Sequence, residues 1–381
     1  MDEKGMDKTH LKELLERYDS MNVSFGSGRV FGSMCTSPHP FATEVHSKFR
    51  ESNLGNPGLY PGTLEMEKEV INMLGGLLHL EDPNGHVLSG GTEANITAMY
   101  AAKKKGRGKK VLFPKSAHFS VMKAVRLLDL EPVTIDLDSS YRMDLSDLED
   151  ELTDDVVMVL AVAGTTELGM VDPVNGISEL LNGVHLHVDA AFGGYVLPFL
   201  EDGILRNRGV RNWDFSSPGV TTLSTDPHKM GWSTIPAGCL LFREQNPLQN
   251  LAVRSPYLTS SKAYTLAGTR DSGAVAAIFA LMKLLGREGY RRMVSGCMEN
   301  TRYLGKRLEE IGFEKVVDPL VNVIAVHHDS PQEVQDELAE MGYFISKVAD
   351  PPALRFVIMP HINKKAIDDL MVPLEKIIGR V

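Results

Sequence analysis

The sequence predicts an α/β fold with a mostly parallel sheet, helices on both of its faces, and a small α+β domain after it. Between residues 111 and 190, short apolar runs alternate with stretches of helical spacing, the pattern of parallel strands joined by helices. Residues 156–163 form a continuous apolar run rich in valine, as expected for a strand buried on both faces. After about Pro247 longer helical patterns take over, so we place a domain boundary near residue 250.

The segments can be assigned in order along the chain. Strands are expected at residues 111–113, 132–137, 156–163, 185–190, 221–224, 237–242, 321–326 and 354–359. Helices are expected at residues 94–105, 119–128, 145–152, 177–181, 273–285, 290–311, 331–341 and 367–378. Pro373 should kink the last helix. We therefore divide the chain into an N-terminal helical or extended segment (1–50), a large ligand-binding domain (51–250), and an interface loop with the small domain (251–381).

Composition and charge exclude several classes of protein. The formal net charge is −10, which disfavours nucleic acid as a partner. One basic run, residues 103–110, fits a solvated helix end and loop better than a phosphate-binding patch. The three cysteines (Cys35, Cys239 and Cys297) are far apart, so we expect neither disulfides nor a cysteine zinc site, and we expect a cytoplasmic location. We expect no membrane span, because no apolar run approaches about 20 residues, and no signal peptide, because residues 1–19 are charged and lack an apolar core.

Two segments near expected strand ends and helix starts could bind a ligand, since ligands in such sheets bind at the carboxyl ends of strands. Residues 89–95 (Ser-Gly-Gly-Thr-Glu-Ala-Asn) could close around an anion, or could simply form a tight helix entry. Residues 185–191 (His-Leu-His-Val-Asp-Ala-Ala) put His185, His187 and Asp189 on one face of a strand. These three side chains could ligate a metal. Alternatively, the histidines are structural, and a buried Asp189 pairs with a cation such as a protonated pyridine nitrogen.

Three further segments hold isolated ionisable side chains. Lys229, in residues 225–231 (Thr-Asp-Pro-His-Lys-Met-Gly), lies between two apolar strands, where burial would lower its pKa and favour imine formation; an exposed turn is the alternative. His118 lies at a strand-to-helix junction on the same sheet edge, either as a ligand-binding residue or as an ordinary first-turn residue. Arg355 is embedded in an apolar strand, where its guanidinium needs a carboxylate from a substrate or from the protein.

In this order and spacing the segments resemble the group II pyridoxal-phosphate decarboxylases, which have the aspartate-aminotransferase-like fold (fold type I). The resemblance runs from about Gly55 to Pro360 and points to the archaeal L-tyrosine/L-aspartate decarboxylase family. The motifs that carry it are residues 89–95, 163–169 (Ala-Gly-Thr-Thr-Glu-Leu-Gly), 187–194 (His-Val-Asp-Ala-Ala-Phe-Gly-Gly), 226–231 (Asp-Pro-His-Lys-Met-Gly) and 359–362 (Met-Pro-His-Ile). It implies pyridoxal 5′-phosphate as the cofactor of the large domain and decarboxylation of an L-amino acid as the reaction.

The resemblance also implies roles for individual residues. Lys229 would hold the cofactor as a Schiff base, Asp189 would pair with the pyridinium nitrogen, and His118 would stack on the ring, with Ala191 beneath its other face. Phosphate binding would fall to Gly91, Thr92 and His228, with Thr166 close to the same site. Arg355 would hold the substrate carboxylate.

The family further implies a homodimer with shared active sites. Thr269 would reach the neighbouring subunit's phosphate. Tyr257 is our first choice for the residue that protonates the product, and Tyr264 is the second; both lie on an expected mobile loop at about residues 249–268. Residues 32–39 could form a wall of the substrate pocket.

The substrate is the least determined part of the prediction. L-tyrosine would give tyramine for methanofuran biosynthesis, and L-aspartate would give β-alanine for coenzyme A biosynthesis; glutamate also remains open, and we favour tyrosine. A second hypothesis keeps the cofactor but changes the reaction, to a carbon–carbon lyase of the sphingosine-phosphate type or a tRNA-dependent sulfur transferase. A remote third is a metal-dependent hydrolase built on His185, His187 and Asp189, although we expect no metal.

Overall fold

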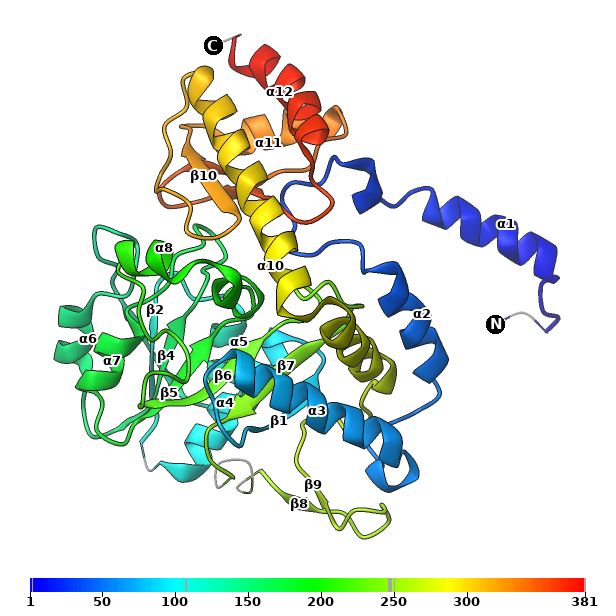
Figure 1. The fold of residues 1–381 in the computed structure, drawn as a ribbon, viewed down its shortest axis with the longest axis vertical. Helices are drawn as coiled ribbons and strands as arrows, with labels where there is room; N and C mark the ends of the chain where they lie inside the picture. The colour runs from blue at the N-terminus through cyan, green and yellow to red at the C-terminus, as the bar shows by residue number, and fades with distance from the viewer. Residues whose placement is uncertain (2, 107, 246–248, 250, 380–381) are drawn as a thin grey trace.

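The computed structural model describes residues 1, 3–106, 108–245, 249 and 251–379. Its centre is a seven-stranded sheet with the strand order β1-β7-β6-β5-β4-β2-β3 (Figure 1). The strands are β1 (Asn84–Leu88), β2 (Lys110–Pro114), β3 (Glu131–Ile135), β4 (Val156–Val162), β5 (His185–Asp189), β6 (Val220–Thr225) and β7 (Gly238–Phe242). Strands β3, β2, β4, β5 and β6 pair in parallel, whereas β7 is antiparallel to both of its neighbours. The predicted mostly parallel α/β sheet is therefore confirmed.

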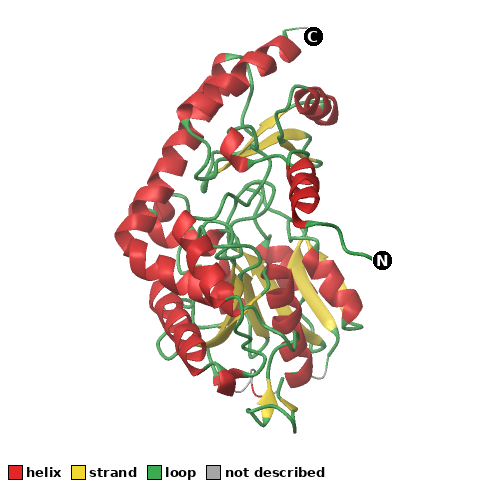
Figure 2. Cartoon of the chain, turned by 90° about the vertical axis from the view of Figure 1, so that its right-hand side faces the viewer, coloured by secondary structure: helices red, strands yellow, loops and turns green. Residues whose placement is uncertain are grey.

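Helices cover both faces of this sheet (Figure 2). The α-helices of this part are α2 (Pro40–Phe49), α3 (Pro61–Leu77), α4 (Gly91–Lys105), α5 (Ser120–Leu127), α6 (Leu145–Glu151), α7 (Val174–Leu180) and α8 (Asp202–Asn207). Short 3-10 turns are η1 (Phe25–Ser27), η2 (Pro57–Leu59), η3 (Gly193–Tyr195) and η4 (Leu197–Phe199). Strand β4 is buried throughout and alternates between two apolar cores. Leu160 and Val162 pack with α4 and α5, whereas Val159 and Ala161 pack with α3 and α7, as expected for a strand buried on both faces.

A single long helical element, α10 (Ser272–Glu310), connects the two parts of the molecule. We expected two separate helices here, at 273–285 and 290–311. Their separation is instead a kink at Gly286, which has a φ of 56°, a conformation that glycine adopts at little cost. Residues of α10 up to Met298 belong to the core of the large sheet, whereas Leu304 and Leu308 belong to a second core. The cores therefore meet within α10, and the proposed division near residue 250 stays a prediction.

The second core belongs to a small C-terminal sheet with two further helices. This antiparallel sheet has the order β10-β12-β11, and its elements are β10 (Val323–His327), α11 (Pro331–Glu340), β11 (Ser346–Val348), β12 (Ala353–Val357) and α12 (Lys364–Ile378). Pro373 lies inside α12. Phe31, far away in the sequence, is also part of this core, and Val30 bridges to Phe344. The N-terminal segment therefore passes between the small sheet and the large one.

Two segments lie outside these layers. Helix α1 (Lys8–Asp19) projects from the body and buries none of its residues (Figure 1). A two-stranded ribbon, β8 (Val253–Arg254) and β9 (Lys262–Ala263), carries the predicted loop. Arg107 of the basic run and Pro247, where we expected the pattern to change, lie outside the described residues. Among the helices that are described, none is long and apolar enough to cross a membrane.

Candidate active site

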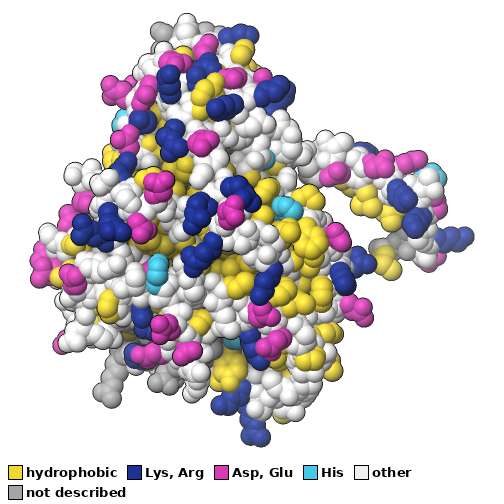
Figure 3. Space-filling view, viewed as in Figure 1, with side chains coloured by type: hydrophobic (Ala, Val, Ile, Leu, Met, Phe, Trp, Pro, Cys, Tyr) yellow, Lys and Arg dark blue, Asp and Glu magenta, His cyan; other side chains and the backbone are white. Residues whose placement is uncertain are grey.

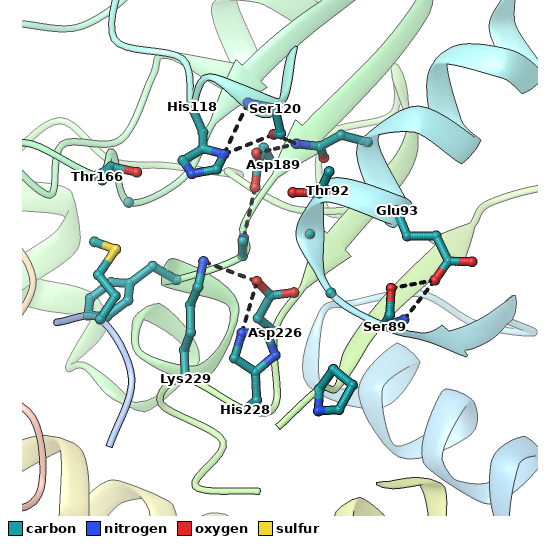
Figure 4. A pocket seen from close by; sticks show the side chains of 18 of the residues that line it. Ser89, Thr92, Glu93, His118, Ser120, Thr166, Asp189, Asp226, His228 and Lys229 are labelled. Carbon is teal, nitrogen blue, oxygen red and sulfur yellow. Dashed lines mark hydrogen bonds and ion pairs between the residues drawn. The ribbon is translucent and has the colours of Figure 1, made fainter. Parts of the chain in front are cut away.

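A cavity of about 350 Å³ lies at the carboxyl ends of β4, β5 and β6, beside the first turn of α4 (Figure 4). This is the edge at which parallel sheets bind ligands. The cavity brings together most of the predicted site residues: Gly91, Thr92, His118, Thr166, Asp189, Ala191, His228 and Lys229. They come from five separate stretches of the chain, so the fold, and not local sequence, assembles the site.

Lys229 enters the cavity from a turn that follows β6. Its Nζ lies 3.0 Å from Oδ2 of Asp226, a buried carboxylate three residues earlier (Figure 4). Burial lowers the pKa of Lys229, but the charges of Asp226 and Asp189 outweigh burial, and the net pKa is raised. Our expectation of a lowered pKa was therefore wrong, because it considered burial without the neighbouring carboxylates.

Asp189 lies at the end of β5 and is held from three sides. Its Oδ2 accepts a hydrogen bond from Nδ2 of Asn95 (2.7 Å), and its Oδ1 accepts one from the backbone N–H of Ala191 (3.0 Å). The hydroxyl of Ser224 lies 3.5 Å from Oδ1. The carboxylate is 5% exposed and faces the cavity, so its orientation is fixed before any ligand binds.

The two histidines of β5 lie behind Asp189. In His187, Nε2 lies 2.9 Å from Oδ1 of Asn95, and Nδ1 lies 2.8 Å from the hydroxyl of Thr222. Burial lowers the pKa of His187 to about 4 and that of His185 to about 3, so both rings are neutral. Because both nitrogens of His187 are already engaged, the geometry favours a structural role for it over metal ligation. No group of three or more potential metal ligands is found among the described residues.

The start of α4 forms the side of the cavity that is suited to an anion. Gly90 has a φ of 152°, and a Cβ on Gly91 would lie 3.1 Å from Oδ2 of Asp226 and 3.2 Å from Cβ of Ala191. Only glycine leaves room at this point for another group to approach the first turn of the helix. The first turn of a helix offers backbone N–H groups and the positive end of the helix dipole to an anion such as a phosphate.

His118 and His228 complete the walls. The backbone N–H of Ser120 donates to Nδ1 of His118 (3.3 Å), and the Ser120 hydroxyl lies 2.9 Å from the same nitrogen. Burial lowers the pKa of His118, which favours a neutral ring at the cavity. His228 is fixed by the backbone N–H of Ala237, which lies 3.2 Å from its Nδ1. Both rings are therefore held at defined positions before a ligand enters.

Four predicted residues do not line this cavity. Tyr257 is 86% exposed on the β8–β9 ribbon, and Thr269 lines a neighbouring cavity of about 450 Å³ that shares Ser89 and Glu93 with the first. Tyr264, the second choice, stacks on His86 at 6.3 Å. Arg355 is 5% exposed in β12 and donates to the carbonyl of Gly32 and to the hydroxyl of Ser346.

Residues that sequence reasoning did not assign also line the cavity. Asp226 and Asn95 lie within quoted motifs, yet their partners follow only from the folded arrangement. Met34 lines the cavity from the segment 32–39 that we expected to form a pocket wall. The one available signal for Asp226 was its spacing of three residues from Lys229 within a Pro-containing turn.

Comparisons with known proteins identify the family and several relatives of this chain. A family model described as "Pyridoxal-dependent decarboxylase conserved domain" matches residues 41–327. A "Probable L-tyrosine/L-aspartate decarboxylase" of Methanothrix thermoacetophila is 43% identical over 380 residues, covering 99% of this chain and 97% of the relative. A "Probable L-aspartate decarboxylase" of Archaeoglobus fulgidus is 40% identical over 372 residues, covering 97% and 99%. A sphingosine-1-phosphate lyase structure from Burkholderia pseudomallei has a TM-score of 0.90 at 25% identity, covering 100% of this chain and 92% of that one.

Proposed function

This chain belongs to the pyridoxal-dependent decarboxylase family, and from that premise we propose that its substrate is L-tyrosine, with L-aspartate as the second candidate. Family membership confirms the predicted cofactor, pyridoxal 5′-phosphate, and the predicted reaction, decarboxylation of an L-amino acid. The names of the two archaeal relatives support the choice of substrates. The product would be tyramine, for methanofuran biosynthesis, or β-alanine, for coenzyme A biosynthesis. The three cysteines are free, which supports our proposal of a cytoplasmic enzyme.

One observation carries the assignment of the site: Lys229 and Asp189 face the same cavity, whose remaining side is a glycine-lined helix start. A lysine amine, a fixed carboxylate and an anion-binding helix end are the groups that this cofactor needs for its aldehyde, ring nitrogen and phosphate. When bound, the cofactor supplies an electron sink for the pair of electrons left behind by carbon dioxide. The residues present therefore fit the cofactor.

Each wall of the cavity then has a separate task. Lys229 would bind the cofactor covalently, and Asp189, held by Asn95 and Ala191, would keep a positive charge on the ring nitrogen. The neutral ring of His118 would stack on one face, with Ala191 below the other. The phosphate would lie against Gly91, Thr92 and His228, with Thr166 nearby.

Arg355 is our proposed anchor for a substrate carboxylate. Its Nε and one Nη are buried and have no hydrogen-bond partner among the described residues, and such donors are costly unless a ligand binds them. Burial lowers the pKa of Arg355 to about 10, so the guanidinium stays charged at neutral pH. Arg355 donates to the carbonyl of Gly32, which lies two residues before Met34 of the cavity wall. Arg355 therefore contacts the segment that we expect to form a wall of the substrate pocket.

We propose a homodimer in which the two chains complete each other's sites. Helix α1 leaves Leu11, Leu15 and Tyr18 exposed on its surface, and Figure 3 shows further apolar side chains gathered over α2 and the first half of α10. Such uncovered apolar surface is typical of an interface. Tyr257 and Thr269 do not line the cavity of their own chain, so a partner's cavity is where we expect them to act.

A product screen tests the reaction and the substrate together. The purified protein is supplied with cofactor and each of the twenty amino acids, and carbon dioxide and amine are measured. We expect tyramine from tyrosine or β-alanine from aspartate, and the variant Lys229→Ala should give neither product nor the yellow colour of the bound cofactor. Release of carbon dioxide from neither amino acid by the yellow wild-type protein would refute the proposed substrates.

The shared site has its own test. Lys229→Ala and Tyr257→Phe chains are each expected to be nearly inactive. Mixed and reassembled, they should form hybrid dimers with one intact site and recover about a quarter of the wild-type activity. If both residues act within one chain, mixing will restore nothing.

A further inference from the structure

The carboxylate of Asp226 lies inside the active-site cavity, yet none of the tasks above uses it. It is 2% exposed, and its Oδ2 lies 3.0 Å from Nζ of Lys229. The same turn is closed by a backbone hydrogen bond from the N–H of Lys229 to the carbonyl of Asp226 (3.0 Å). Carboxylate and ammonium group are thus fixed to each other by one rigid turn, as Figure 4 shows.

We propose that Asp226 is a positioning residue for Lys229, which holds the ε-ammonium group and its proton in the cavity whenever the lysine is not bound to the cofactor. The proposal deepens, and rests on, the assignment of Lys229 as the cofactor-binding residue. It gives the lysine a defined place to withdraw to once substrate has replaced it.

Comparison with the other buried aspartates supports this role. Asp172, Asp189 and Asp214 each accept hydrogen bonds from backbone N–H groups, between 2.7 and 3.0 Å, so they fix the fold around them. Asp226 accepts none in the described part of the chain, and its Oδ1 has no partner at all. Its one strong contact is Lys229. A buried carboxylate without structural hydrogen bonds is costly to keep, which argues that it serves the lysine.

The surroundings explain why the contact matters. Nε2 of His228 lies 3.9 Å from the same carboxylate oxygen, and the first turn of α4 approaches at Gly91. The positive helix end and the ammonium group would repel one another without Asp226. The carboxylate also favours the protonated lysine, because an opposite charge at this distance stabilises the ammonium form. The direction of the Lys229 pKa agrees with this geometry.

The test measures protonation of Lys229 without cofactor or substrate. Cofactor-free protein is acylated briefly with acetic anhydride across a range of pH, and the Lys229 peptide is quantified by mass spectrometry against exposed Lys12 of α1. In the wild type we expect the Lys229 midpoint above that of Lys12. In Asp226→Asn it should move to lower pH, and below both midpoints Lys229 should react about tenfold faster, since one pKa unit is the least that such a charge pair usually contributes.

Two control variants separate the charge of Asp226 from other effects of the substitution, and the wild type gives a separate test. Asp226→Glu retains the charge and should keep the midpoint above that of Lys12, whereas Asp214→Asn removes a buried carboxylate outside the cavity and should leave Lys229 unchanged. An unchanged midpoint in a folded Asp226→Asn protein overturns the proposal. If that variant does not fold, a wild-type Lys229 midpoint at or below that of Lys12 overturns it instead. Failure of decarboxylation would not affect this measurement, so the two proposals can fail separately.

Discussion

A buried ion pair beneath the β8–β9 ribbon allows a quantitative test of how this fold is held together. Glu67 of α3 is 3% exposed, and both of its carboxylate oxygens accept hydrogen bonds from the guanidinium of Arg270, one at 3.2 Å and a shorter one from Nη1. The backbone N–H of Val87 also donates to it (2.9 Å). Arg270 follows Thr269 directly, so the pair anchors the end of the ribbon segment to the large sheet.

The contribution of this ion pair to the free energy of unfolding follows from the pKa of Glu67. Burial opposes ionisation, but His86 and Arg270 outweigh it and lower the pKa of Glu67 from 4.5 to about 2. At about 1.4 kcal/mol per unit, ionisation in the folded state is worth about 3 kcal/mol. Removing one partner of a buried pair typically costs about 3 to 5 kcal/mol, because the other charge stays buried. We therefore expect Glu67→Gln to lose about 3 kcal/mol of unfolding free energy at pH 7.

Urea unfolding followed by circular dichroism measures this loss, with Glu67→Gln/Arg270→Met as the matched control. The control leaves no unpaired cation and should recover most of the stability. Because the folded-state pKa is depressed, the stabilisation is complete above pH 4.5 and is lost as pH falls toward about 2, so the gap between wild type and Glu67→Gln should close over that window. A gap at pH 7 of less than about 1 kcal/mol, or one that does not change down to pH 2.5, refutes the reasoning.

Three further predictions concern buried polar groups. Asn95→Ala removes a hydrogen bond to the charged Asp189, so kcat should fall about tenfold to a hundredfold while the yellow colour persists; an unchanged kcat would contradict the role of Asn95. Burial raises the pKa of Asp172 from 3.8 to about 6. The stability of the wild type relative to Asp172→Asn should therefore fall by about 3 kcal/mol as pH rises through 6. Urea unfolding midpoints that keep a constant difference between pH 4 and pH 7 would exclude this. Arg355→Lys loses the planar fork and should raise KM about tenfold with a smaller effect on kcat; an unchanged KM would place the substrate carboxylate elsewhere.

The architecture was predictable because its signals are local. The valine-rich run of β4 and the glycines before α4 each indicate their own structure, and strand ends in a parallel sheet converge on one edge. That is why Lys229, Asp189 and His118, far apart in the sequence, could be placed together. The kink at Gly286 interrupts the helical pattern just as a gap between two helices would, so the sequence alone predicts two helices here.

What the sequence did not reveal depends on partners. The pKa of Lys229 has the opposite direction from our expectation because Asp226 and Asp189 face it, and no periodicity shows which carboxylates will do so. The hydrogen bonds of Asn95 to Asp189 and His187 likewise join α4 to β5 and exist only in the folded chain. Tyr257 and Thr269 lie outside the cavity of their own chain, because the positions of both depend on how the segment after β7 folds back over the large sheet.

The two carboxylates of the cavity show how the same residue type acquires different tasks. Asp189 accepts hydrogen bonds from Asn95 and from the backbone of Ala191, so its ionised form is stabilised and its direction is fixed, which suits the proposed role as a permanent partner for a cationic ring. Asp226 has Lys229 as its one strong contact, so its charge is compensated only while that lysine is protonated and free. If Lys229 forms and breaks a covalent bond to the cofactor as we propose, the environment of the Asp226 carboxylate changes each time that bond forms or breaks. With the roles we propose for Lys229, Asp189 and Asp226, the pair would combine a fixed charge with one that responds to each cycle of the reaction.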